Sequence, residues 1–142
     1  MSANLFVSLF VVILSVLIHY EFLYTSSKII PTLKLGHRIR VLVAVFVTLF
    51  AHIIEIILYG IVFYIMSSSP SWGHLEGNFD GSLLDSIYFS FTNFSTLGFG
   101  DIAPLGDIRL LVGLEGIVGF ILITWSATYL FFEMQNNWNS KD

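Results

Sequence analysis

The sequence contains no cysteine, and charged residues make up only 11% of its 142 residues. The lack of cysteine excludes a disulfide framework and a thiolate metal site. Soluble domains carry about one quarter charged residues, so this low charge and the mean hydropathy of +0.83 argue against a soluble enzyme. The six Lys and Arg residues are too few for a basic nucleic-acid-binding surface. We therefore expect a membrane protein that has membrane lipid, and no nucleic acid, as a partner.

Several functional motifs are also missing. No segment has Arg or Lys at every third position, which argues against a voltage-sensor helix. Nucleotide-binding loops, metalloprotease helices and catalytic triads have no counterpart, so we expect no enzymatic activity and no organic cofactor. The chain after Phe132 is short, and it predicts no soluble ligand-binding domain.

Long apolar runs dominate what is present. A bilayer core about 30 Å thick takes about 20 helical residues to cross, and three runs reach that length. Because lipid offers no hydrogen-bond partners, each run is expected to be an α-helix. The predicted organisation is an N-terminal membrane helix at 1–24, a linker at 25–40, a second domain at 41–133 and a short tail at 134–142. The second domain contains membrane helices at 41–66 and 107–133.

Basic residues gather in the linker between the first two membrane helices, namely Lys28, Lys34, Arg38 and Arg40. The positive-inside rule places such a linker in the cytoplasm. The N-terminus then lies outside and the C-terminus in the cytoplasm, in a multi-pass protein of the cell membrane. Apolar residues between the basic ones indicate a segment that lies on the membrane surface, although an ordinary connector fits equally well.

The segment between the second and third membrane helices differs in composition from both. Residues 67–81 are rich in Ser, Gly, Pro and Asp and are expected to form an exposed turret. Residues 82–95 predict a helix too short to cross the bilayer, with Ser82 as its N-cap and Asp85 near its positive end. A Gly-rich stretch at 96–101 follows at once. This order predicts a re-entrant loop, which is tolerated only where it is buried in protein or lines water.

The Gly-rich stretch reads Thr-Leu-Gly-Phe-Gly-Asp from Thr96 to Asp101. Its alternating glycines allow backbone conformations that other residues avoid, so successive carbonyls can face one side. Four copies of such a strand around an axis would form rings of oxygens that replace the hydration shell of a cation. The C-terminal end of the short helix would add partial negative charge toward the centre.

This stretch resembles the filter signature of potassium channels, which usually reads Thr-Val-Gly-Tyr-Gly-Asp. With the short helix and both flanking membrane helices, the resemblance covers about residues 40–133, and the chain is similar to small bacterial channels with an extra N-terminal helix. It implies an all-α membrane protein with three transmembrane helices, a re-entrant pore helix and a selectivity-filter loop. It also implies a homotetramer that conducts K⁺ passively, with a pore domain at 41–133. The K⁺-binding residues that it implies are Thr96, Leu97, Gly98, Phe99 and Gly100, with the ions themselves at the first four.

Two filter positions depart from the usual form. Leu97 replaces Val, and Phe99 replaces Tyr and so lacks a hydroxyl that could bond the pore helix. A potassium-selective channel is the first interpretation. A weakly selective or non-conducting pore-fold protein with a regulatory role is the alternative.

Four residues are candidates for holding the filter in place: Tyr88, Thr92, Asn93 and Asp101. By resemblance, Tyr88 belongs to an aromatic cuff around the filter. Thr92 stands where some members of the family place a carboxylate that pairs with the final Asp of the filter. Asp101 is therefore expected to find another partner, either Tyr88 or Asn93.

Three ionisable residues fall near the middle of the predicted membrane helices, namely His52, Glu55 and Glu115. His52 and Glu55 share a helix face because they are three residues apart, and Glu55 and Glu115 differ in depth by only about 6 Å. Ionisable groups at that depth are costly and usually face protein or water. We expect one buried cluster behind the pore helix that is structural, senses pH or holds a metal ion. The last two roles make an intramembrane proton or metal handler a rival function.

Glycines recur on one face of the third membrane helix, at Gly113, Gly116 and Gly119. Small residues at this spacing allow another helix to approach closely. The resemblance to potassium channels offers a second role, because their inner helix often bends at a glycine. Gly119 and then Gly116 are the hinge candidates.

Overall fold

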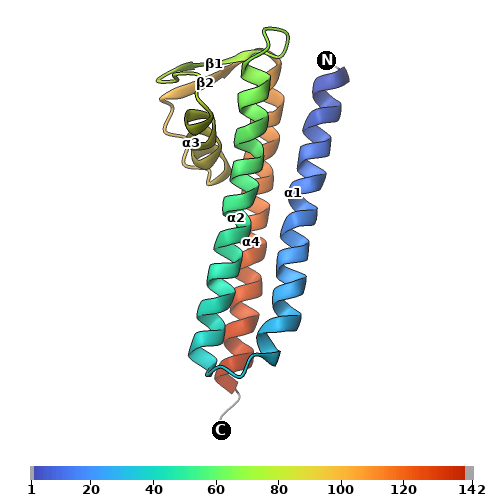
Figure 1. Ribbon diagram of the computed structural model, residues 1–142, viewed down its shortest axis with the longest axis vertical. Coiled ribbons are helices and arrows are strands. Elements are labelled where there is room, and N and C mark those ends of the chain that lie inside the picture. Colours follow the sequence, from blue (N-terminus) through green and yellow to red (C-terminus); the bar gives the residue numbers. More distant parts are fainter. Residues whose placement is uncertain (1, 140–142) are drawn as a thin grey trace.

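The computed structural model describes residues 2–139, and three long helices dominate it (Figure 1). Helices α1 (Ser2–Ile29), α2 (His37–Ser67) and α4 (Arg109–Asn139) run side by side along the long axis of the molecule. A shorter helix, α3 (Leu83–Phe94), lies beside the upper part of α2 and α4. The predicted all-α membrane fold with three long apolar helices is confirmed for the described residues.

Length and composition make each long helix a candidate membrane span. Within residues 2–139, the apolar spans cover Ala3–Thr32, Arg38–Ser67 and Gly106–Asn136, with mean hydropathies of 2.2, 2.7 and 1.9. A helix of this length rises about 45 Å, whereas the hydrocarbon core is about 30 Å thick. Each helix is therefore long enough to cross the hydrocarbon core.

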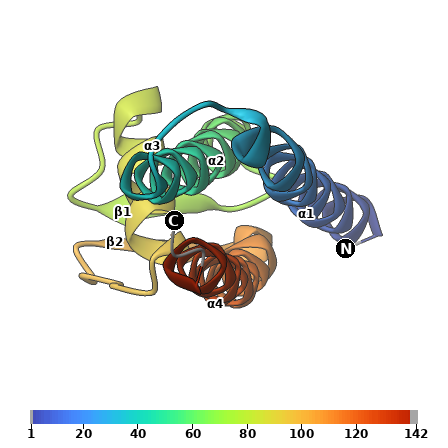
Figure 2. The ribbon, with the colours of Figure 1, turned by 90° about the horizontal axis from the view of Figure 1, so that it is seen from below.

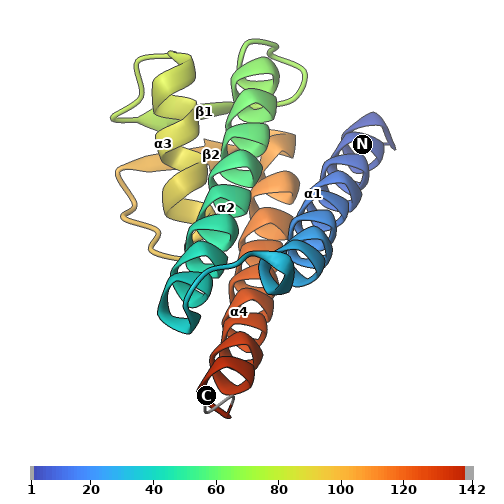
Figure 3. The same ribbon diagram turned by 60° about the horizontal axis from the view of Figure 1, so that its bottom comes forward.

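The connection between α1 and α2 is shorter than the sequence analysis predicted. Helix α1 continues past residue 24 to Ile29, and α2 begins at His37, so most of the predicted linker at 25–40 is helical. Polar residues alone do not end a helix, and the chain leaves α1 only where Pro31 enters a 3-10 turn, η1 (Ile30–Thr32). Figure 3 shows this short crossing from the lower end of α1 to the lower end of α2.

The predicted end of the last membrane helix is also wrong. We expected it to stop at residue 133, but α4 continues to Asn139. The reason is that no glycine or proline follows Phe132 to break the helix. Of the predicted tail at 134–142, residues 140–142 lie outside the described residues.

Two short strands join the predicted turret to the segment after the Gly-rich stretch. Strand β1 (His74–Gly77) pairs antiparallel with β2 (Ile102–Leu105). The approach needs glycine, because a Cβ on Gly73, whose φ is +100°, would lie 2.1 Å from the carbonyl oxygen of Leu105. The sequence analysis missed this ladder, since strands of four residues show no clear alternation of apolar and polar residues.

Helix α3 packs into the groove between α2 and α4. A Cβ on Gly60 of α2 would lie 2.8 Å from the Cα of Ile87, so the two helices touch backbone to backbone there. Phe63 and Phe89 meet edge to face above this contact, with ring centroids 5.2 Å apart. Small residues and interlocked aromatic rings thus fix the short helix against the membrane helices.

Helix α1 lies on the opposite side of α2 and α4 from α3 (Figure 2). It exposes large apolar side chains such as Phe6 and Phe10 and buries a polar stripe against its neighbours. The polar residues of this stripe, spaced four or seven positions apart, are Asn4, Ser8, Ser15, His19 and Ser26. The face that α1 turns to the protein therefore combines small and hydrogen-bonding side chains with the apolar Val11 and Leu23.

Candidate ion-conduction site

The start of α3 is fixed by a compact set of hydrogen bonds. The Ser82 Oγ accepts a bond of 3.1 Å from the backbone N–H of Asp85, which confirms the predicted N-cap. The Asp80 carboxylate accepts the backbone N–H of Ser82 at 2.7 Å, and the Asp85 carboxylate accepts the backbone N–H of Asp80 at 2.9 Å. Hydrogen bonding by Ser82 holds the pKa of Asp80 below its usual value.

The Gly-rich stretch leaves α3 with an alternating backbone. Thr96, Gly98 and Gly100 have φ values of 60°, 51° and 78°, whereas φ is not positive at Leu97 or Phe99. Alternation between left-handed and right-handed residues turns successive peptide groups the same way, so the carbonyls of this stretch can share one side. Thr96 is the only described residue other than glycine with a positive φ.

Two backbone bonds connect this stretch to the end of α3. The N–H of Thr96 donates to the carbonyl of Asn93 at 2.9 Å, and the N–H of Gly98 donates to the carbonyl of Thr92 at 3.0 Å. The side chains of Leu97 and Phe99 remain 58% and 64% exposed in the single chain. The end of α3 therefore anchors the first part of the stretch. The large side chains of Leu97 and Phe99 stay uncovered in the single chain.

Asp101 finds one of its two expected partners. The Tyr88 hydroxyl donates to the Asp101 carboxylate at 3.0 Å. This bond raises the pKa of Tyr88 above its ordinary value, because the neighbouring carboxylate favours the protonated phenol. Thr92 is buried and donates to the carbonyl of Phe89 at 2.9 Å, so its side chain lies away from Asp101.

The other expected partner, Asn93, turns toward α4. Its amide Nδ2 donates to the Val112 carbonyl at 2.8 Å and to the Glu115 carboxyl group at 2.5 Å. Ser90 lies between Glu115, at 2.5 Å, and the carbonyl of Ile56, at 2.9 Å. Glu115 is fully buried. Its hydrogen bonds connect α4 with α3 and, through Ser90, with α2.

The prediction that His52, Glu55 and Glu115 form one buried cluster is therefore wrong. Nδ1 of His52 lies 3.1 Å from one Glu55 oxygen, and Nδ1 of His19 in α1 lies 3.0 Å from the other, each within hydrogen-bond distance. Glu115 forms its side-chain hydrogen bonds with Ser90 and Asn93 of α3 instead. Similar depth did not bring the carboxyl groups together because Glu55 faces α1, whereas Glu115 faces α3.

His19 is the residue that sequence reasoning missed. The first uncharged apolar run of the sequence ends just before His19. Helix α1 nevertheless extends ten residues beyond His19, to Ile29. Ser126 of α4 closes the group, with its hydroxyl 3.3 Å from Nε2 of His19 and 3.1 Å from Nε2 of His52. The spacing of polar residues along α1 was the signal that could have found it.

The glycines of α4 differ in what surrounds them. A Cβ on Gly119 would lie 2.1 Å from the carbonyl oxygen of Phe94, so this glycine seats the end of α3. A Cβ on Gly116 would lie 3.8 Å from the Asn93 side chain, and one on Gly113 would meet nothing within 4 Å. Close packing therefore accounts for Gly119, and a hinge at Gly116 or Gly119 stays a prediction.

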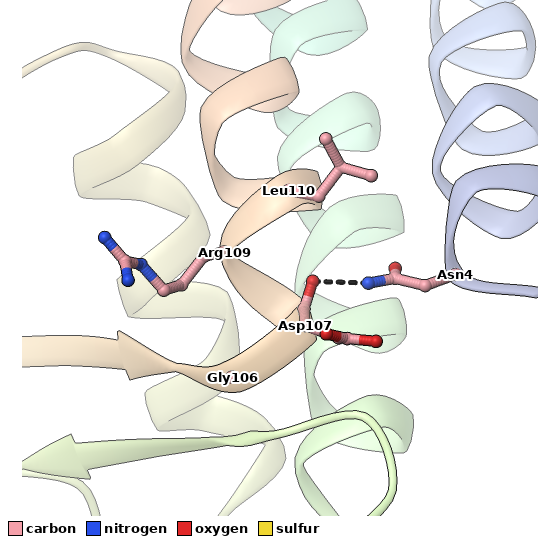
Figure 4. Close-up of a pocket in the computed structure, with 5 residues that line it drawn as sticks. All are labelled: Asn4, Gly106, Asp107, Arg109 and Leu110. Atoms are coloured by element: carbon pink, nitrogen blue, oxygen red, sulfur yellow. Dashed lines mark hydrogen bonds between the residues drawn. The ribbon is translucent and has the colours of Figure 1, made fainter. Parts of the chain in front are cut away.

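The upper end of α1 is tied to the start of α4. In the pocket shown in Figure 4, the side-chain amide of Asn4 donates to the backbone carbonyl of Asp107. Gly106, Arg109 and Leu110 complete the lining. This contact and the Ser26–Tyr129 hydroxyl pair, at 2.8 Å, attach α1 to α4 near opposite ends.

A comparison with known protein families finds one family that matches this chain. A sequence model of the family described as "Ion channel" matches residues 42–136, which include most of α2, all of α3, the Gly-rich stretch and most of α4. No curated protein and no solved structure gives a significant match.

Proposed function

The chain belongs to the ion channel family, and from that premise we propose that it forms a homotetrameric, potassium-selective channel. The observation that carries the proposal is the Thr-Leu-Gly-Phe-Gly-Asp stretch, whose φ is positive at Thr96, Gly98 and Gly100. Carbonyls that share one side, multiplied by four, would form oxygen rings that replace the hydration shell of K⁺. The rings would come from Thr96, Leu97, Gly98 and Phe99, with Gly100 completing the filter.

Backbone strain supports a functional role for this stretch. A β-branched residue such as Thr96 avoids positive φ, and such positions cost about 1–3 kcal/mol and concentrate at functional sites. The strain is located where α3 ends, so the negative end of the helix dipole lies next to the first filter residues. The helix dipole favours a cation over an anion at this place.

The exposed filter side chains support assembly. Leu97 and Phe99 are large, apolar and mostly exposed in the single chain, and exposed apolar groups of this kind mark interaction surfaces. Since one chain supplies one loop, four loops around an axis would cover them and close the rings. This closed cyclic arrangement is a common symmetry for membrane and soluble oligomers alike.

The distribution of basic residues supports an orientation. Lys28 near the end of α1 and Arg38 and Arg40 at the start of α2 lie at one end of the molecule, opposite the strands and α3 (Figure 1). The positive-inside rule would place that end in the cytoplasm. The filter would then open to the outside, with the N-terminus outside and the C-terminus in the cytoplasm.

The test is ion flux into liposomes that contain the purified full-length protein. We expect K⁺ uptake to exceed Na⁺ uptake and to be blocked by Ba²⁺. Gly98→Ala places a Cβ at φ +51° in the filter and should abolish the flux. The matched control is Gly113→Ala, which adds a Cβ in open space and should conduct normally. Equal K⁺ and Na⁺ flux, or full flux in Gly98→Ala, would overturn the proposal.

A further inference from the structure

Three side chains of metal-ligating type converge between α1 and α2, away from the filter. His19, His52 and Glu55 each offer one ligand atom, and these atoms all lie within 4.8 Å of one another. His19 and Glu55 are fully buried, and the His52 side chain is 15% exposed. The two imidazole rings stack with centroids 5.1 Å apart. Both Nδ1 atoms face Glu55, and both Nε2 atoms face Ser126.

The donor set and its spacing suit a divalent transition metal. Imidazole nitrogen and carboxylate oxygen are the usual ligands of Zn²⁺, at about 2.0–2.2 Å in tetrahedral sites. Neighbouring ligand atoms in such a site lie about 3.3 Å apart. The Nδ1 atoms of His19 and His52 are already 3.0 Å and 3.1 Å from the two Glu55 oxygens. An ion bound here would take the place of the two Nδ1 protons.

Ser126 provides the outer support that metal-bound histidines require. A ligating histidine donates its remaining ring N–H to an oxygen nearby, which fixes the orientation of the ring. The Ser126 hydroxyl lies 3.3 Å and 3.1 Å from the two Nε2 atoms, and its oxygen has two lone pairs. With both Nδ1 atoms on the metal, Ser126 can accept both Nε2–H groups.

Without an ion, the ring nitrogens of neutral His19 and His52 cannot all form hydrogen bonds with an ionised Glu55 and with Ser126. If both histidines are neutral and donate from Nδ1 to Glu55, both Nε2 atoms are acceptors. Ser126 has a single hydroxyl hydrogen, so it can serve only one of them. One buried ring nitrogen then lacks its hydrogen bond, unless one imidazole carries an extra proton.

We propose that His19, His52 and Glu55 form a binding site for one divalent transition-metal ion of the zinc class per chain, with Ser126 as a positioning residue. The ion would clamp α1 to the pore domain, because His19 belongs to α1 and the other two ligands to α2. It would also lie beside the C-terminal end of α3, because the His52 ring contacts the ring of Phe94, with centroids 5.7 Å apart.

Metal content and metal spectra test this site without any measurement of flux. The full-length protein is prepared in detergent without a polyhistidine tag, stripped with a chelator and titrated with Zn²⁺. We expect one Zn²⁺ bound per chain by elemental analysis. Co²⁺ in place of Zn²⁺ should give visible absorption much stronger than that of the hydrated ion. Less than one ion for every four chains, or Co²⁺ with only the weak spectrum of the hydrated ion, would overturn the proposal.

Variants locate the ion. His19→Gln, His52→Gln and Glu55→Gln keep side-chain size and should each abolish stoichiometric binding. His74→Gln removes a histidine of β1, and Glu115→Gln changes a buried carboxyl group outside the site, so both should bind Zn²⁺ as the wild type does. Ser126→Ala leaves all three ligands intact and should weaken affinity 10- to 100-fold. Unchanged affinity in the His19 and His52 variants would show that the ion binds elsewhere.

Discussion

At the scale of single residues, Tyr88 supplies a hydrogen bond to the proposed filter that Phe99 cannot, and this bond is its proposed brace. Phe99 has no hydroxyl, whereas the Tyr88 hydroxyl donates to Asp101 at the C-terminal end of the same stretch. The brace depends on the phenol proton, and its hydrogen bond to Asp101 raises the pKa of Tyr88 above the ordinary 10.0. The contribution of this bond to stability is therefore complete below pH 10 and is lost as the pH rises through the raised pKa.

We predict that Tyr88 titrates at higher pH than an unpaired tyrosine and that the filter loosens when it does. The tyrosinate absorbance of the wild type minus that of Tyr88→Phe should rise at higher pH than the absorbance of an ordinary exposed tyrosine. Tyr88→Phe should also show a lower ratio of K⁺ to Na⁺ flux at neutral pH. Tyr64→Phe, which changes an exposed tyrosine of α2, is the control. A ratio in Tyr88→Phe equal to that of the wild type would contradict the brace.

Gly119 and Gly113 make a matched pair within one helix. In an unhindered helix position, alanine is more stable than glycine by about 0.5–1 kcal/mol, and Gly113→Ala should raise the melting temperature accordingly. Gly119→Ala would place a Cβ 2.1 Å from the Phe94 carbonyl oxygen and should displace the end of α3, at a cost of about 1–3 kcal/mol. Thermal unfolding in detergent measures both. A neutral Gly119→Ala would mean that α3 does not seat on this glycine.

At the scale of elements, Glu115 joins α4 to α3 and α2. The hydrogen bonds around its carboxyl group require that this group carries a proton. Ser90 has one hydroxyl hydrogen but two acceptor neighbours, the Ile56 carbonyl and a Glu115 oxygen. Both bonds form only if Ser90 donates to Ile56 and the Glu115 carboxyl group donates to Ser90. The second Glu115 oxygen accepts from Asn93, so the neutral acid satisfies every group.

This count predicts that glutamine replaces Glu115 with little loss. Glu115→Gln can donate from its amide to Ser90 and accept from Asn93, so the melting temperature should stay near that of the wild type. Glu115→Ala leaves both partners without a bond and should lose about 1–3 kcal/mol. Thermal unfolding of the two variants separates the possibilities. If Glu115→Gln is as unstable as Glu115→Ala, the wild-type side chain is an ionised carboxylate.

The elements also show where sequence reasoning is sufficient and where it is not. The three long helices follow from apolar length, and the start of α3 follows from Ser82, because both depend on local composition. The hydrogen-bond partners of Glu55 and Glu115 do not follow from local composition, because these partners depend on which helix each face of α2 and α4 meets. The β1–β2 ladder was also beyond reach, since it pairs segments on either side of α3.

At the scale of the whole molecule, a single chain leaves its proposed filter incomplete. Leu97 and Phe99 are exposed, and one loop provides one carbonyl at each level. If function requires four intact loops, a defective subunit should disable every assembly that contains it.

We predict that Gly98→Ala is dominant over the wild type. When the two chains are co-expressed in equal amounts, only about one sixteenth of random tetramers contain four wild-type loops. K⁺ flux per chain should fall to about that fraction of the wild-type value. The measurement is liposome flux of the co-purified mixture, with Gly113→Ala as the co-expressed control. Half of the wild-type flux would indicate that each chain works alone.

The β1–β2 ladder has a practical consequence for labelling the end of the molecule that is proposed to lie outside the cell. It ties the chain before α3 to the chain after the proposed filter, so an insertion within His74–Gly77 or Ile102–Leu105 would displace both ends of that stretch. The loop that comes before the ladder bears no such connection at Pro70 and Ser71, where the Ser69–Ser71 side-chain bond is local. An epitope tag or fluorophore inserted between Pro70 and Ser71 would report surface expression and topology while leaving conduction unchanged.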